Sequence, residues 1–161
     1  MPIAIRTTVH AESTQAFLRD LAGRIGDVGP ALRGFGRVML RSISENFEQE
    51  GRPLAWKPLA QATRDARRHG TGSVNRPREH SILSNTGLLK GGMRYLVEGN
   101  VLRVGTSGPA NVYARIHQLG GQAGRGHAVT IPARPYLLFQ HEDLTEAEEL
   151  IRRYVEGRGR A

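Results

Sequence analysis

The chain has 161 residues, of which 39% are hydrophobic, and it carries a formal net charge of +8. This length suits a single domain over residues 1–161, and no run approaches the ~18 apolar residues of a membrane span. The absence of cysteine excludes disulfides, thiol catalysis and cysteine-ligated zinc. We therefore expect a basic domain without a membrane segment, whose charge suits an acidic partner such as DNA.

The positive charge is unevenly distributed along the chain. Arginine supplies nearly all of it, because Lys57 and Lys90 are the only lysines. No acidic residue occurs between Glu98 and Glu142, an interval that contains four arginines. Arginine forms bidentate contacts with carboxylates and phosphates, so the interval predicts a surface that faces DNA or an acidic neighbour. A compositional bias of the genome explains the preference for arginine equally well.

The first part of the chain predicts a strand and a helix. Apolar and polar residues alternate over residues 3–9, which is the pattern of a half-buried strand. Ser13 or Thr14 is expected to cap the helix that follows. The apolar stripe of this helix consists of Phe17, Leu18, Leu21 and Ile25.

The longest predicted element is an amphipathic helix over residues 31–50, which begins after Pro30 and stops at Gly51. Its apolar residues recur at spacings of three and four, and arginine and glutamate occupy the opposite face. At about 30 Å, this helix would span a small domain. Trp56 follows its end and is expected to fill the core beside it. The expected core residues are Leu32, Phe35, Met39, Ile43, Phe47 and Trp56.

The middle of the chain combines a basic loop with a β-hairpin. A short helix is predicted over residues 58–68, followed by a mobile loop at residues 69–80 that has too few apolar residues to fold on its own. A turn or short helix is expected at residues 85–89. Two β-rich runs, 93–97 and 101–105, then flank a Gly-Asn turn and predict an antiparallel hairpin.

The next stretch predicts a helix followed by an excursion. The helix is expected over residues 109–119, with Tyr113 and Ile116 directed inward and Leu119 as a further candidate. Residues 120–127 are rich in glycine and predict a second mobile loop. Strand pieces are expected beyond it, at residues 129–131 and 136–139.

A final helix is predicted over residues 143–156, capped by Asp143 or Thr145 through a capping box. The residues expected on its buried face are Leu144, Ala147, Ile151, Tyr154 and Val155. Together the elements predict an α+β fold: a small antiparallel sheet packed against a long amphipathic helix plus shorter helices, with extended mobile loops.

No catalytic constellation emerges from the sequence. Three histidines could in principle surround a metal ion, but their spacing matches no known ligand pattern. They are His117, His127 and His141. The glycines at residues 120–126 lack the following helix and the Lys-Ser or Lys-Thr pair of a phosphate loop, so a hairpin arm is the better interpretation. We therefore expect no enzyme, no cofactor and no metal site; a histidine-dependent metal hydrolase is the distant alternative.

Four stretches taken together carry a resemblance to a known family. They are residues 46–63 (NFEQEGRPLAWKPLAQAT), 82–89 (ILSNTGLL), 104–121 (VGTSGPANVYARIHQLGG) and 131–137 (IPARPYL). Their order and spacing resemble the phage virion morphogenesis family, the tail-completion proteins of Mu-like and related tailed phages. The chain departs from the family pattern at Gly91-Gly92 and in its unusually basic loop at residues 69–80.

The resemblance implies a non-enzymatic structural protein of the neck, the junction between phage head and tail. Such proteins are assembled in the host bacterial cytoplasm as rings, here with implied sixfold symmetry, that cap the tail tube and meet the head–tail connector proteins. A basic lumen would contact the passing genomic DNA through its phosphates. A stopper or adaptor ring nearer the head and a free, non-sequence-specific DNA-binding protein remain as alternatives.

Aromatic and arginine side chains are enriched at protein interfaces, so we expect the partner surfaces among them. The expected subunit-interface residues are Tyr113, Arg115, Arg125, Arg134 and Tyr136. The expected DNA-facing or partner-facing residues are Arg67, Arg68, Arg76 and Arg78. Neutralising Arg125 and Arg134 together is expected to impair assembly and to leave the protomer folded.

Overall fold

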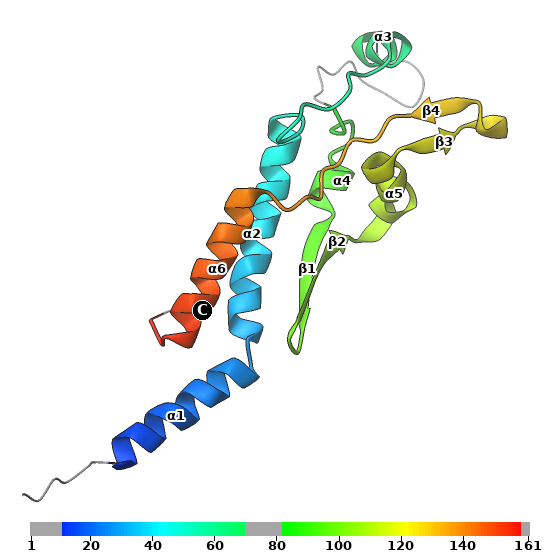
Figure 1. Ribbon diagram of the computed structural model, residues 1–161. Helices are drawn as coiled ribbons and strands as arrows, with labels where there is room; N and C mark the ends of the chain where they lie inside the picture. The colour runs from blue at the N-terminus through cyan, green and yellow to red at the C-terminus, as the bar shows by residue number, and fades with distance from the viewer. Residues whose placement is uncertain (1–10, 70–81, 159–161) are drawn as a thin grey trace, which may run out of the picture.

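The computed structural model describes residues 11–69 and 82–158, and for residues 11–14 the backbone alone. The fold is α+β, as the sequence predicts, with a long helix between a β-hairpin and a second helix (Figure 1). The predicted strand at residues 3–9 and the predicted loop at residues 69–80, apart from its first residue, lie outside the described part of the chain.

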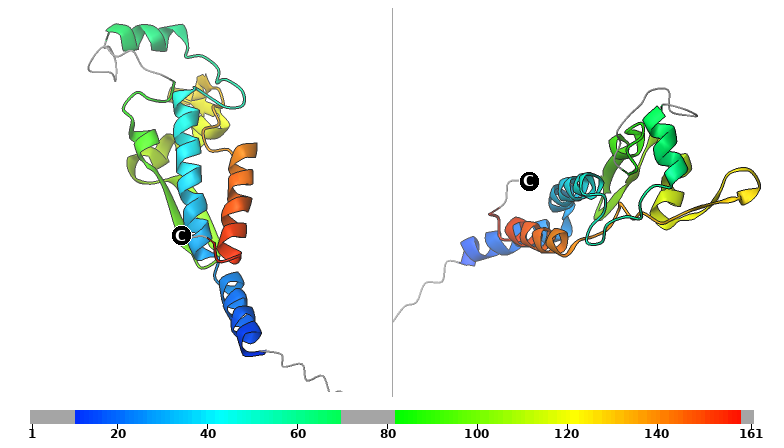
Figure 2. Two further views of the ribbon diagram at one scale, coloured as in Figure 1. Left: turned by 90° about the vertical axis from the view of Figure 1, so that its left-hand side faces the viewer. Right: turned by 90° about the horizontal axis from the view of Figure 1, so that it is seen from above.

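A long helix, a C-terminal helix and a hairpin form the body of the molecule. They are α2 (Gly29–Glu48), α6 (His141–Val155) and the hairpin of β1 (Met93–Glu98) and β2 (Val101–Thr106). Helix α6 packs along one side of α2 and the hairpin packs along another (Figure 1, Figure 2). The long helix therefore covers the small sheet, as predicted.

Further elements lie at the two ends of this body. Helix α1 extends from one end, whereas α3, α5 and a small second hairpin gather at the other (Figure 1, Figure 2). These elements are α1 (Ala11–Gly26), α3 (Gln61–His69), α5 (Asn111–Leu119), β3 (Gly121–Ala123) and β4 (Val129–Ile131). Short helical pieces connect them: α4 (Leu88–Gly91), η1 (Gly108–Ala110) and η2 (Arg125–His127).

Helix α2 begins and ends where local backbone chemistry dictates. Pro30 occupies its first turn, where a missing backbone N–H costs nothing. The chain leaves the helix through Glu50 and Gly51, both with positive φ (54° and 113°). A Cβ on Gly51 would lie 2.5 Å from the carbonyl oxygen of Leu54, so this turn requires glycine.

The core lies on the face of α2 that meets the hairpin and the loops beyond it. Met39, Ile43, Phe47 and Trp56 are buried, as predicted. Leu32 and Phe35 were expected there as well, and this prediction is wrong: both are half-buried, and neither belongs to the core cluster. Small residues occupy the closest contacts instead, because helix and sheet approach closely; a Cβ on Gly36 would lie 2.5 Å from the ring of Tyr95.

The hairpin β1–β2 confirms its prediction, with each strand one residue longer. Glu98 pairs with Val101, which leaves Gly99-Asn100 as a two-residue turn. The Asn100 side chain accepts a hydrogen bond from the Val28 amide (3.2 Å) and donates one to the Gly26 carbonyl (3.2 Å). The hairpin tip therefore holds the junction between α1 and α2.

Several predicted helix boundaries need correction. Helix α1 begins at Ala11, so Ser13 and Thr14 lie inside it and are not its cap. Helix α3 begins at Gln61, three residues later than predicted, and buries none of its side chains. Gln140, not Asp143 or Thr145, is the N-cap of α6.

Some expectations about strands and buried faces are also wrong. Residues 136–139 form no strand. Leu144 and Ile151 of α6 are exposed, because this helix meets α2 through Asp143 and Ala147. Leu119 is likewise exposed at the end of α5. The excursion at residues 120–127 is confirmed as part of a hairpin arm, because β3 pairs with β4.

Candidate assembly surfaces

The four stretches that resemble the known family meet in one interior cluster, which we call the motif core. The first stretch contributes Phe47, whose ring centroid lies 5.7 Å from that of Trp56 and 5.5 Å from that of Tyr136. The other members of the motif core include Ile82, Leu83 and Leu89 from the second stretch and Ala110 and Ala114 from the third. The residues that carry the resemblance therefore hold the fold together.

The fourth stretch is an extended segment that side chains hold in place. The Trp56 indole donates to the Pro135 carbonyl (2.8 Å), and the Asn46 amide donates to the Tyr136 carbonyl (2.9 Å). The Gln118 side-chain oxygen accepts from the amides of Tyr136 and Leu137, at 3.1 Å each. Because these side chains satisfy its backbone, the segment needs no neighbouring strand.

Arg134 and Tyr136, expected at a subunit interface, point into the protomer. Both are buried, with 5% and 4% of their surface exposed. The Arg134 guanidinium donates to the carbonyls of Lys57 (2.9 Å) and Pro58 (3.0 Å). The Tyr136 hydroxyl donates to the Ala114 carbonyl (3.1 Å), and burial raises its pKa. The structure corrects the expectation that both lie at a subunit interface, because the polar groups of both side chains form hydrogen bonds within the chain.

A buried polar network joins α2 to α6, and sequence reasoning did not identify it. The Asp143 carboxylate accepts from the Ser42 hydroxyl (2.7 Å) and from the Gln140 amide (2.9 Å). Arg52 donates to the Ser42 hydroxyl (2.7 Å) and to the Asn46 side-chain oxygen (2.9 Å). Since these buried groups satisfy one another, the network is structural. The sequence signal for this network is a pair of polar residues, Ser42 and Asn46, which lie one helical turn apart beside the apolar stripe of α2.

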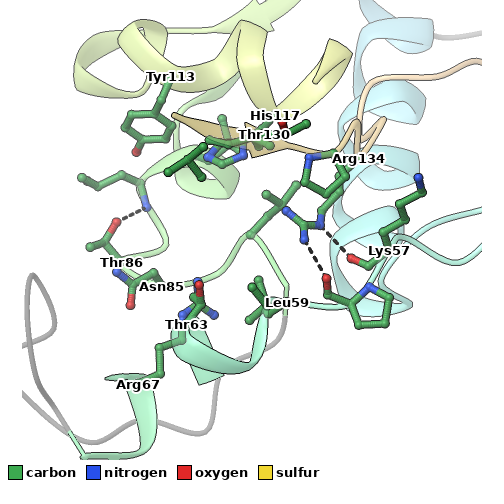
Figure 3. Close-up of a pocket in the computed structure, with 18 residues that line it drawn as sticks. Lys57, Leu59, Thr63, Arg67, Asn85, Thr86, Tyr113, His117, Thr130 and Arg134 are labelled. Atoms are coloured by element: carbon green, nitrogen blue, oxygen red, sulfur yellow. Dashed lines mark hydrogen bonds between the residues drawn. The ribbon is translucent and has the colours of Figure 1, made fainter. Parts of the chain in front are cut away.

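A groove of about 700 Å³ opens at the end of the body where α3, α5 and β4 meet (Figure 3). In Figure 3 its walls include Tyr113 and Thr86 on one side and Lys57 and Arg134 on the other. Apolar side chains contribute most of the lining: Leu59, Leu83, Leu88, Leu89, Val129 and Ile131. Its size falls in the ~300–1,000 Å³ range of sites that enclose most of a ligand.

The charge around the groove is positive. Burial lowers the pKa of Arg67, which reaches into the groove from α3. Burial, followed by the charge of Arg134, lowers the pKa of His117, so its ring is held neutral. The buried Nδ1 of His117 has no hydrogen-bond partner in the described residues. The groove can therefore receive apolar groups flanked by carboxylates.

The remaining predicted site residues are dispersed. Arg68 is exposed on α3, Arg115 on α5 and Arg125 at the tip of the arm. Tyr113 and Arg67 are brought together at the groove. Arg76 and Arg78 lie outside the described residues.

A second unpartnered surface lies at the opposite end of the molecule, on α1. Phe17, Leu18 and Ile25 each leave more than half of their surface exposed, at 58%, 55% and 58%. We call these three residues the α1 face. Exposed apolar patches mark interaction sites, and apolar side chains are exposed at both ends of the molecule.

Neither a metal site nor a membrane span was found in the described residues. No three histidine, aspartate or glutamate side chains in that part of the chain are grouped to hold a metal ion. The helices described there include none with the length and apolar character needed to cross a membrane.

Comparison with known proteins gives a consistent result. The sequence profile of the phage virion morphogenesis family matches residues 9–156. The chain is also similar to the Mu-like prophage FluMu G protein 2 of Haemophilus influenzae, with 33% identity over 147 residues that cover 91% of this chain and 92% of that protein. No solved structure matches the chain.

Proposed function

This chain belongs to the phage virion morphogenesis family, and from that premise we propose that it is a tail-completion protein. Membership makes it a component of virion assembly. In our proposal it is non-enzymatic, forms a sixfold ring on top of the tail tube as a tail terminator, and joins the completed tail to the head–tail connector in the neck.

The observation that carries this proposal is the placement of unpartnered apolar surface. Within the described residues, the motif core and the buried polar network are complete, whereas the groove and the α1 face leave apolar side chains exposed. Figure 1 shows α1 at one end of the molecule and α3, α5 and β4, which surround the groove, at the other. Surfaces that differ and lie at opposite ends suit head-to-tail contacts, which close into rings when the rotation between copies allows it.

The positive charge fits the same role. Arg68, Arg115 and Arg125 are exposed side chains in a chain with a net charge of +8. A ring with such residues around its lumen would contact passing DNA through the phosphates, without reading its sequence. The competing reading, a free DNA-binding protein, uses the same charge but gives no role to the two apolar surfaces.

In vitro complementation tests the proposal. A lysogen deleted for this gene should, on induction, accumulate DNA-filled heads and separate tails, and adding the purified protein to that lysate should restore joined, infectious particles. Electron microscopy of the unjoined tails should show the protein at the end of the tail that attaches to the head. Empty or absent heads in the deletion lysate would instead indicate a function in head assembly and would contradict the proposal.

DNA-binding affinity measured over a series of salt concentrations distinguishes the proposed ring from the alternative, a free DNA-binding protein. A free DNA-binding protein should bind duplex DNA tightly as a monomer or dimer at low salt, with an affinity that falls steeply as salt rises. The ring proposal predicts weak binding by the isolated protein and no effect of DNA on its self-association.

A further inference from the structure

Strand β2 presents a free edge. The Ser107 amide donates to the Gly92 carbonyl (2.9 Å), one step beyond the last pair of the hairpin register. Because bonded and non-bonded pairs alternate along an antiparallel ladder, the backbone groups of Leu102, Val104 and Thr106 point away from β1. In the described part of the chain, no hydrogen bond to these outward groups occurs. Such an edge is a template for pairing with a further strand.

The outer edge of β1 is less accessible. The Met93 carbonyl at its start accepts a hydrogen bond from the Arg94 guanidinium (2.6 Å), which also donates to the Gly91 carbonyl (2.8 Å). A charged side chain folded over a strand edge opposes the approach of another strand. The edge of β2 is therefore the better template of the two.

The face of the hairpin that meets α2 is apolar, and it leaves room for a third strand. The Tyr95 ring lies against Gly36 of α2, and Tyr95 pairs with Val104 across the hairpin. Leu102 shares this face, yet both Leu102 and Val104 are only half-buried. A strand beside β2 would continue the face if its apolar and polar residues alternate.

A segment with this pattern precedes α1 and lies outside the described residues. Every second residue from 3 to 9 is β-branched: Ile3, Ile5, Thr7 and Val9. Arg6 and Thr8 lie between them and would occupy the opposite, solvent-facing side. Since β-branched residues are enriched in strands, the sequence of this segment matches what the edge of β2 can receive.

The position of α1 prevents this segment from reaching β2 of its own copy. Asn100, in the hairpin turn, bonds to the junction between α1 and α2, and α1 and the hairpin extend from that junction in opposite directions (Figure 1). The sixteen residues of α1 span about 24 Å. At about 3.3 Å per extended residue, the return from Ala11 to the turn alone would take roughly seven residues. Residues 3–9 would be used up before they reached Leu102.

We propose that residues 3–9 of one copy add as a third strand to the free edge of β2 in the next copy. The inference rests on the proposed ring and names one joint that builds it. Main-chain hydrogen bonds would supply affinity, and the alternating side chains would supply register. Each copy donates one strand and receives one, so the contact is heterologous and uses every strand and every edge once around a closed ring.

Crosslinking of single-cysteine variants tests the joint, because the natural chain has no cysteine. Thr8→Cys and Arg103→Cys proteins, mixed and treated with a short bismaleimide, should give a covalent pair that contains one chain of each. Either variant alone should give none, and the doubly substituted chain should give a ladder of multimers. Arg152→Cys is the matched control for Arg103→Cys, because both arginines are exposed and Arg152 lies on α6; mixed with Thr8→Cys, it should not crosslink.

Light scattering on two pairs of substitutions gives a second, independent readout. Ile3→Ser/Ile5→Ser removes two apolar side chains from the face that would meet α2 of the next copy, and should weaken self-association at least ~10-fold. Arg6→Ser/Thr8→Ser, on the outward side of the same segment, should change self-association by less than ~3-fold. Circular dichroism should report the same helix content for both variants, because all four positions precede α1.

Three results would overturn the inference. The doubly substituted chain could crosslink only internally, the mixed Thr8→Cys and Arg103→Cys proteins could give no crosslink, or the two serine pairs could affect self-association equally. A wild-type ring that forms without the mixed crosslink would leave the proposed tail-completion function intact. Failure of the wild-type protein to complement the deletion lysate would remove the proposed function instead.

Discussion

The motif core and the α1 face differ in how far they bury similar aromatic side chains. Phe47 in the motif core is 1% exposed and lies against two other aromatic rings, whereas Phe17 on α1 is 58% exposed and has no ring partner among the described residues. The residues that carry the family resemblance form the motif core and also line most of the groove. Helix α1, whose apolar side chains are exposed, lies outside all four resembling stretches.

The largest expected effect comes from removing an aromatic ring from the motif core. Phe47→Ala should lower the free energy of unfolding by about 3–5 kcal/mol, because it leaves a cavity between Trp56 and Tyr136. Phe139→Ala, which removes a 60% exposed ring stacked on Phe35 at 6.0 Å, should cost less than about 1.5 kcal/mol. Urea denaturation followed by tryptophan fluorescence measures both, and equal losses would contradict a distinct motif core.

Substituting one buried and one exposed arginine tests the same contrast between interior and surface residues. Arg134→Gln should destabilise the protomer by about 1–3 kcal/mol, because the buried guanidinium loses its hydrogen bonds to the carbonyls of Lys57 and Pro58. Arg125→Gln, at the exposed tip of the arm, should change stability by less than about 0.5 kcal/mol. The double substitution of Arg125 and Arg134 therefore also destabilises the protomer, so its effect cannot be assigned to assembly alone. The effect of the single substitution at Arg125 can. Thermal melting of the two single variants decides whether this distinction holds.

A smaller effect is expected from pH, through His117 beside the groove. Burial lowers its pKa from the ordinary 6.5, so the unfolded chain binds a proton more readily than the folded one. Its contribution is complete above pH 6.5 and is lost as the pH falls through 6.5 toward the lower folded-state pKa. His117→Gln should flatten the decline in unfolding free energy between about pH 7.5 and pH 5.5. An unchanged pH slope in the His117 variant would refute this assignment.

The sequence predicts those parts of the fold that local chemistry determines. Helix α2 and the hairpin β1–β2 were predicted within two residues at each end, because a 3.6-residue apolar period and a Gly-Asn turn are local signals. The arm was also anticipated, since glycines at the turn of a hairpin need no distant partner.

Other features depend on contacts between distant residues, so periodicity alone did not reveal them. The residue type of Arg134 predicts a surface position, yet its hydrogen bonds to the carbonyls of Lys57 and Pro58 hold the side chain in the interior. Residues 136–139 look like a strand, but Gln118 and Asn46 satisfy their backbone in place of a neighbouring strand. The apolar pattern of α1 predicts a buried face, whereas Phe17, Leu18 and Ile25 are exposed in the described part of the chain.

The molar mass of the wild-type protein tests the central claim most directly. Light scattering at micromolar concentration, in low and in high salt, should give one discrete mass that is a multiple of 17.7 kDa. The multiple should survive high salt, because salt screens charged contacts between subunits and leaves apolar contacts intact. A mass of one chain at both salt concentrations would contradict the proposed ring.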